Sequence, residues 1–142
     1  MNILGLNAYH GDVAAALVRD GQLVAAVEEE RFRRIKHVAG FPHHAIAACL
    51  EMGGIAASDV DLFAVSRDPR AHLWRKALFL LKNRPKGTVA SRARNLASLR
   101  ALPATIAKSL SLDEAVARQR TRFVEHHPAH LASAAFVSPF DE

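Results

Sequence analysis

The first 27 residues contain three short apolar runs that polar breaks separate. The runs cover residues 3–6, 13–19 and 23–27. Asp20 and Gly21 stand between the second and third runs, and this pair is a strong signal for a tight hairpin turn. Because the runs are nearly continuous rather than alternating, we expect strands that are buried on both faces of a sheet. The chain therefore opens with a predicted strand–loop–strand–hairpin–strand unit.

Helical spacing replaces this pattern after residue 42. Pro42 suits the first turn of a helix, and the apolar residues after it recur with helical spacing until Gly53 and Gly54. Residues 60–65 form a fourth apolar run that is typical of a strand. Beyond it we predict helices over 73–84, 89–102 and 103–110, a short strand over 122–124, and a last helix from Pro128 to Ser138. An α/β domain is expected, and 142 residues suit a single domain.

The composition is that of an ordinary globular protein, with 50% apolar and 23% charged residues. No apolar run approaches the about 18 residues that would span a membrane. The first residues lack a basic segment and a cleavage site, so we predict no signal peptide. The single cysteine, Cys49, cannot form an internal disulfide, and we interpret it as a small buried hydrophobe. These features suit a cytoplasmic protein.

Positive charge is concentrated in one part of the chain. Residues 67–122 carry 14 Lys and Arg against three acidic residues, a local charge of +11, whereas the whole chain carries +5. Such asymmetry is found on surfaces that bind nucleic acid or phosphate. The alternative is a solvated basic face on helices. The single Trp74 gives no regular aromatic interleaving, so nucleic acid is poorly supported as a partner.

His126 and His130 form the sharpest chemical pattern in the sequence. Side chains four residues apart converge from one turn of helix, and imidazole is the commonest metal ligand near neutral pH. Pro128 would start the helix, which puts His126 at a strand end and His130 in the first helical turn. The alternative is a pair of surface histidines. Two histidines cannot complete a coordination shell, so a carboxylate must come from elsewhere, and iron or another borderline metal is expected.

A polar loop, His10-Gly11-Asp12, follows the first predicted strand. Backbone amides in such a loop can cradle a phosphate, and Gly11 would permit close approach of a ligand. His10 is a candidate general base that Asp12 would orient. The alternative is a polar turn in which Asp12 caps the local backbone.

Residues 28–32, with Lys36 and His37, form a dense charge block directly after the third predicted strand. Charges in this position are expected to be salt-bridged or bound to a ligand. Arg31 and Lys36 suit phosphate and carboxylate partners. A solvated charged turn that covers Phe32 is the alternative.

Together these segments resemble the start of the NodU/CmcH-type O-carbamoyltransferases. The resemblance is carried by residues at both ends of the chain: 3–12, 24–32, 36–37, 40–42, 126–130 and 138–140. It implies transfer of a carbamoyl group from carbamoyl phosphate, through a carbamoyl-adenylate made with ATP, to a hydroxyl of a small-molecule acceptor. It also implies the first part of a domain with the actin-like, RNase H-like (ASKHA) fold.

The family pattern extends beyond this chain. The family's N-terminal domain is much longer than 142 residues, its aspartate metal ligands follow the segment 138–140, and a YrdC-like domain makes the adenylate. We therefore expect residues 1–142 to be the N-terminal portion of the catalytic domain and to be inactive alone.

The resemblance assigns roles to individual residues. His126 and His130 match the paired metal ligands, with iron as the expected ion. His10 matches the active-site histidine, although Gly11 separates it from Asp12 where many members have His followed directly by Asp. The resemblance and the charge pattern make Gly11, Arg31, Lys36 and His37 candidate ligand-facing residues. Three rivals remain: a sugar-kinase-like phosphotransferase on the same fold, a basic nucleic-acid-binding module, and a hydrogenase-maturation or tRNA-modifying relative.

Overall fold

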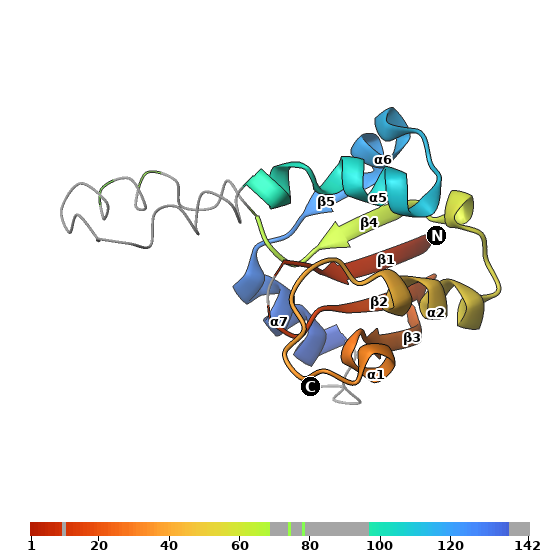
Figure 1. Cartoon of the computed structure of the whole chain (residues 1–142), viewed down its shortest axis with the longest axis horizontal. Coiled ribbons are helices and arrows are strands. Elements are labelled where there is room, and N and C mark those ends of the chain that lie inside the picture. Colours follow the sequence, from red (N-terminus) through yellow and green to blue (C-terminus); the bar gives the residue numbers. More distant parts are fainter. Residues whose placement is uncertain (10, 69–73, 75–77, 79–96, 137–142) are drawn as a thin grey trace.

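A computed structural model of the chain describes residues 1–9, 11–68, 74, 78 and 97–136. Five strands form one mixed sheet in the order β3-β2-β1-β4-β5 (Figure 1). The strands are β1 (Asn2–Asn7), β2 (Ala14–Arg19), β3 (Gln22–Glu28), β4 (Leu62–Val65) and β5 (Thr121–Phe123). The helices of the described part include α1 (Glu30–Arg33), α2 (His43–Gly53), η1 (Ala57–Asp59), α5 (Leu102–Leu110), α6 (Glu114–Arg120) and α7 (His126–Phe136). The α/β class expected from the sequence is confirmed.

The first three strands form the predicted strand–loop–strand–hairpin–strand unit. β1 pairs with β2, and β2 pairs with β3, both antiparallel. Asp20 and Gly21 join β2 to β3 with φ angles of 50° and 84°. Positive φ at both central residues defines the turn type that matches the twist of a hairpin, so the predicted turn is confirmed. The N-terminal ammonium group of Met1 also pairs with the carboxylate of Asp20.

The last two strands run parallel to the first. β4 pairs with β1 so that Phe63 lies opposite Leu4, and β5 pairs with β4 so that Arg122 lies opposite Ala64. Because β2 reverses direction between β1 and β3, β3 also runs in the direction of β1. The carboxyl ends of β1, β3, β4 and β5 therefore lie at one edge of the sheet.

The two faces of the sheet differ within the described residues. One face carries Leu4, Leu6 and Leu17, which are buried against α2 and α5. Gly5, Ala14, Ala16, Ala26 and Ala64 line a hollow on the other face together with Ala129 of α7. Figure 1 shows α2 in front of the sheet and α7 behind it. Our prediction of strands buried on both faces was thus wrong for these residues, because small alanines give an apolar run on a face that remains partly open.

Helix α2 has the limits that its sequence predicts. It begins directly after Pro42 and ends at Gly53, and the next residue, Gly54, has a φ of 60°, the left-handed cap conformation that glycine adopts at low cost. Ala45, Ile46 and Cys49 are its buried residues. Cys49 is fully buried, which confirms its interpretation as a small hydrophobe.

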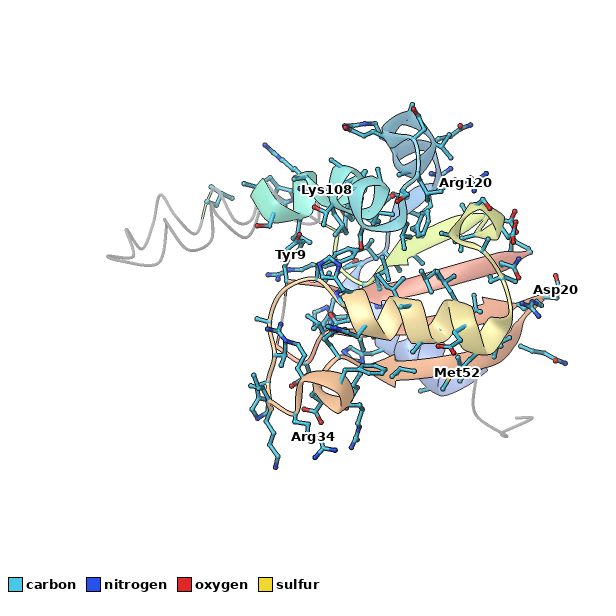
Figure 2. The ribbon with its side chains drawn as sticks, turned by 45° about the vertical axis from the view of Figure 1, so that its right-hand side comes forward. Tyr9, Asp20, Arg34, Met52, Lys108 and Arg120 are labelled. Carbon is cyan, nitrogen blue, oxygen red and sulfur yellow. The ribbon has the colours of Figure 1, made fainter. Side chains whose placement is uncertain are left out.

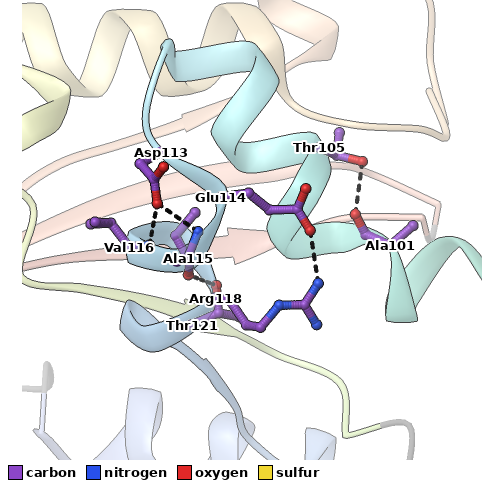
Figure 3. A network of polar contacts seen from close by, with 9 residues as sticks. Ala101, Thr105, Asp113, Glu114, Ala115, Val116, Arg118 and Thr121 are labelled. Carbon is purple, nitrogen blue, oxygen red and sulfur yellow. Dashed lines mark hydrogen bonds and ion pairs between the residues drawn. The ribbon is translucent and has the colours of Figure 1, made fainter.

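The C-terminal helices agree less closely with the pattern. α5 fits the helix predicted over 103–110, whereas α6 was not predicted. Asp113 begins α6 by accepting the backbone N–H groups of Ala115 and Val116 at 2.8 and 3.2 Å (Figure 3). α7 begins at His126, two residues before Pro128.

Two of the predicted helices lie mostly outside the residues that the structure describes. Residues 97–100 are helical, and so are Trp74 and Leu78, but the rest of the helix predicted over 73–84 and most of that over 89–102 lie outside the described residues. The basic segment on which the nucleic-acid alternative rests is therefore described only in part. In the part that is described, no helix is both long and apolar enough to cross a membrane.

Candidate active site at the carboxyl ends of the strands

Each strand that ends at the common edge is followed by a polar segment. The loop 8–13 follows β1, and the charge block 28–37 follows β3. Ser66 and Arg67 follow β4, and Glu125 and His126 follow β5. Ligands in open α/β sheets bind outside the carboxyl ends of the strands. The topology therefore brings nearly all the sequence-predicted site segments to the place where a ligand is expected.

The loops after β1 and β3 are joined through their backbones. Tyr9 N–H donates to the carbonyl of Gly40 at 2.7 Å, and Val13 N–H donates to that of Val38 at 3.2 Å. Tyr9 also points toward α5, where its hydroxyl lies 3.5 Å from that of Thr105 (Figure 2). The two loops therefore form one layer at this edge.

Backbone strain is concentrated in this layer. Tyr9, Asp12 and His37 have φ angles of 58°, 62° and 57°. Non-glycine residues adopt this conformation at a cost of roughly 1–3 kcal/mol, and such residues cluster at functional sites.

Asp12 pairs with His37. Its Oδ1 lies 2.9 Å from His37 Nδ1, and both side chains are more than half exposed. We expected Asp12 to orient His10, but His10 lies outside the described residues, so its role as a base stays a prediction. A Cβ added at Gly11 would meet no heavy atom within 4 Å, which leaves space beside the loop.

One residue of the charge block after β3 is buried and stabilises the fold. Glu29 is buried, and its carboxylate accepts from His44 Nδ1 at 2.6 Å and from Ala45 N–H at 2.9 Å. Burial raises the pKa of Glu29, but the hydrogen bonds from His44 and Ala45, together with the charge of His44, outweigh burial and hold the pKa below its usual value. Phe32 stacks on the His44 ring, with centroids 5.8 Å apart.

The remaining members of the block are exposed. Arg31 lies 3.7 Å from Glu28 in an exposed ion pair, and Lys36 is exposed. The sequence analysis did not identify Glu29 as the residue that caps α2. Its signal was a carboxylate directly after a strand in a chain where Pro42 cannot cap the next helix with its side chain.

His126 and His130 converge. Both belong to α7, and their Nε2 atoms are 3.0 Å apart with the rings nearly perpendicular at 86°. His126 Nδ1 lies 3.4 Å from the carbonyl oxygen of Ser66. A carbonyl only accepts, so this contact requires the proton on Nδ1 and directs the Nε2 lone pair toward His130. Outer contacts of this kind fix the tautomer of metal-binding histidines.

A series of contacts links the first loop to this histidine pair. The side-chain amide of Asn7 donates to the carbonyl of Asp12 at 2.9 Å, and the Ser66 hydroxyl donates to Asn7 Oδ1 at 3.4 Å. Ser66 then contacts His126 through its carbonyl. The sequence analysis missed both Asn7 and Ser66. Their signal was a polar residue placed at the carboxyl end of an apolar strand.

Two adjoining hollows lie at this edge and share Asn7 and Ser66. The larger, about 700 Å³, is lined mainly by small apolar residues of the open sheet face, with Glu28 and Arg31 at its rim. The smaller, about 180 Å³, is lined by four residues with polar side chains, Asn7, Ser66, Arg67 and His126. Small-molecule sites combine an apolar hollow of this size with a few convergent polar groups.

His126 and His130 do not by themselves complete a metal site within the described residues. No group of three or more His, Cys, Asp or Glu side chains in that part of the chain is placed to hold a metal. Two imidazoles suit a borderline divalent ion, and the remaining ligands would have to come from other residues.

The fold is that of an α/β domain, and the hollows make the carboxyl ends of its strands a candidate small-molecule site. The family described as "Carbamoyltransferase N-terminus" matches residues 2–142, so the chain belongs to this family.

Two relatives match this chain over nearly its whole length. An uncharacterized protein of Synechocystis, sll1178, is 40% identical over 99% of this chain. The nodulation protein NolNO of Sinorhizobium fredii is 38% identical over 96% of it. The chain spans only 24% and 19% of the length of these two relatives.

Proposed function

We propose that the protein transfers a carbamoyl group from carbamoyl phosphate, through a carbamoyl-adenylate made with ATP, to a hydroxyl of a small-molecule acceptor. The family match across residues 2–142 carries this proposal. The structure supports it through one arrangement: the first loop, Ser66 and the histidine pair meet beside two adjoining hollows. A mixed five-stranded sheet is compatible with the first part of an actin-like domain.

His126 and His130 are proposed as two ligands of a divalent metal, with iron preferred. The donor chemistry fits, because two imidazoles converge and the contact with Ser66 favours the tautomer of His126 that presents Nε2. A divalent ion held by His126 and His130 would supply Lewis acidity at this place. The described residues position the imidazoles and hold the proton on His126 Nδ1.

The layer formed by the loops after β1 and β3 is proposed to receive the acceptor hydroxyl. Asp12 orients His37 in the way that an acidic side chain orients a general base. His37 therefore joins His10 as a candidate base. Arg31 and Lys36 would face the ligand from the same side, and Arg31 already lines the larger hollow.

The adenylate-forming step is assigned to a YrdC-like domain of the whole protein. The family resemblance implies this domain, and the chain covers about a quarter or less of its two relatives. A cytoplasmic location also stays a prediction, which rests on the single buried cysteine.

The test is a reconstitution with the full-length protein. Carbamoyl phosphate, ATP and a panel of small hydroxyl-bearing acceptors are supplied, and the nucleotide and acceptor products are identified by mass spectrometry. We expect AMP and a carbamoylated acceptor. ADP and a phosphorylated acceptor would instead support the phosphotransferase alternative and contradict the proposal.

The metal assignment has a separate test. Metal content of the full-length protein is compared with that of His126→Ala, His130→Ala and the neighbouring control His127→Ala. We expect about one divalent ion per chain in the wild type and in the control, with a large loss in the other two variants. Equal metal content in all four proteins would refute the assignment.

A further inference from the structure

Arg67 occupies an unusual position at the edge of the sheet. It follows β4 directly, and its backbone N–H donates to the carbonyl of Val65 at 2.8 Å. The residue is partly buried and lines the hollow of about 180 Å³ together with Asn7, Ser66 and His126. Arg67 thus lines the same hollow as His126, the first member of the histidine pair.

Arg67 is partly buried and has no side-chain partner within the described residues, whereas Arg33, Arg34 and Arg100, which also lack one there, are exposed. Arg31 and Arg118 pair with carboxylates, and Arg19 and Arg120 donate to backbone carbonyls. Within the described residues, no ion pair or side-chain hydrogen bond engages the Arg67 guanidinium. A partly desolvated cation in a hollow is stabilised by an anion, because burial of an uncompensated charge is costly.

We propose that Arg67 forms an anion subsite that binds the phosphoryl group of the activated carbamoyl donor. This inference rests on the proposed function. A guanidinium matches phosphate oxygens with two parallel hydrogen bonds, and a phosphoryl group is the anion that the carbamoyl-adenylate carries.

The surroundings of the hollow suit this ligand. A volume of about 180 Å³ holds several water molecules of about 30 Å³ each, which a phosphoryl group would displace. α7 has 11 residues and begins at His126, so its positive end lies at the same hollow. The adjoining apolar hollow leaves room for the rest of the donor or for the acceptor. The phosphoryl group would then lie beside the histidine pair.

Arginine-specific modification of the full-length protein by phenylglyoxal tests the subsite directly. Peptide mass spectrometry follows the modification rate of Arg67 with and without AMP or inorganic phosphate. At about ten times its Kd, either ligand should slow modification of Arg67 about tenfold. Arg118, whose partner is Glu114, is the matched control and should be unaffected. Unchanged reactivity of Arg67, or equal protection of Arg118, would overturn the proposal.

Activity of R67Q and R67K separates this inference from the proposed function. We expect R67Q to lower carbamoyl transfer by about 10–100-fold, the usual worth of a hydrogen bond to a charged group, and R67K to lower it less. If R67Q transfers carbamoyl groups as fast as the wild type, the subsite proposal is wrong, while the proposed function stands. Protection of Arg67 in a protein that transfers no carbamoyl group would support the anion subsite and remove the function.

Discussion

Replacing Glu29 with glutamine tests whether the charge block after β3 holds the fold together. Glu29 is 1% exposed and accepts hydrogen bonds from His44 Nδ1 and Ala45 N–H, at the first turn of α2. Pro42, which precedes that helix, makes no side-chain cap. The carboxylate therefore satisfies a helix N-terminus from another segment of the chain, and its charge also suits the positive end of α2.

The cost of E29Q follows from these contacts. Glutamine keeps one acceptor oxygen of similar shape, so one of the two hydrogen bonds is lost or weakened. A hydrogen bond to a charged group contributes about 1.5–3 kcal/mol, and solvent lowers this value because the His44 side chain is 61% exposed. We therefore expect E29Q to lower the free energy of unfolding by about 1–2 kcal/mol at pH 7.

The effect should depend on pH in a defined direction. The pKa of Glu29 is lower in the folded protein than its ordinary value of about 4.3. A lowered pKa in the folded state gives stability that is fully present above the unfolded pKa. That stability is lost as the pH falls through the folded pKa, so wild type and E29Q should converge in acid.

Urea unfolding followed by circular dichroism measures both effects in the full-length protein. Glu28→Gln is the matched control, because Glu28 is exposed and pairs with Arg31 only at 3.7 Å, which predicts a loss below about 0.5 kcal/mol. If E28Q and E29Q unfold at the same urea concentration, the capping role is wrong. A gap between wild type and E29Q that persists unchanged into acid would refute the electrostatic part.

Two further predictions concern packing and capping. A Cβ at Gly53 would lie 2.3 Å from Cδ2 of the fully buried Leu17, so Gly53→Ala should lower the free energy of unfolding by about 1–3 kcal/mol. The control is Met52→Ala on the exposed side of the helix, which should lower it little. Equal losses of unfolding free energy in the two variants would contradict the packing argument. Asp113→Ala removes the cap of α6 and should cost about 0.5–2 kcal/mol, with recovery in Asp113→Asn; a stable alanine variant would show that the cap is dispensable.

Local rules accounted for most of the elements that the sequence predicts well. The turn at Asp20-Gly21 was predictable because a two-residue hairpin constrains its own backbone angles. α6 was missed because it buries only Ala117, so no apolar stripe marks it, although Asp113 is a suitable cap residue. The open face was missed for a related reason, since Ala14 and Ala16 are apolar in the sequence and tolerate partial exposure.

In the candidate site, too, contacts between residues close in the sequence were predictable and contacts between distant residues were not. Convergence of His126 and His130 follows from helix geometry, which acts over four residues. The partners of Asp12 and Asn7 lie 25 and 59 residues away, so they depend on which loops meet in space. Sequence reasoning assigned Asp12 to its neighbour His10, because it weighs proximity along the chain and has no information on the loop that follows β3.

Strand direction explains why the family motifs are widely separated in the sequence and adjacent in the fold. β2 lies between β1 and β3, and the chain reverses direction before and after it. The charge block that follows β3 therefore lies at the same edge of the sheet as the loop that follows β1. β4 and β5 then join parallel to β1, and each adds its carboxyl end to the same edge. Asn7, Ser66 and His126 are separated by 59 and 60 residues, yet they form consecutive contacts. A site of this kind needs only a few residues at each strand end, so the segments between those ends are under little constraint from its chemistry.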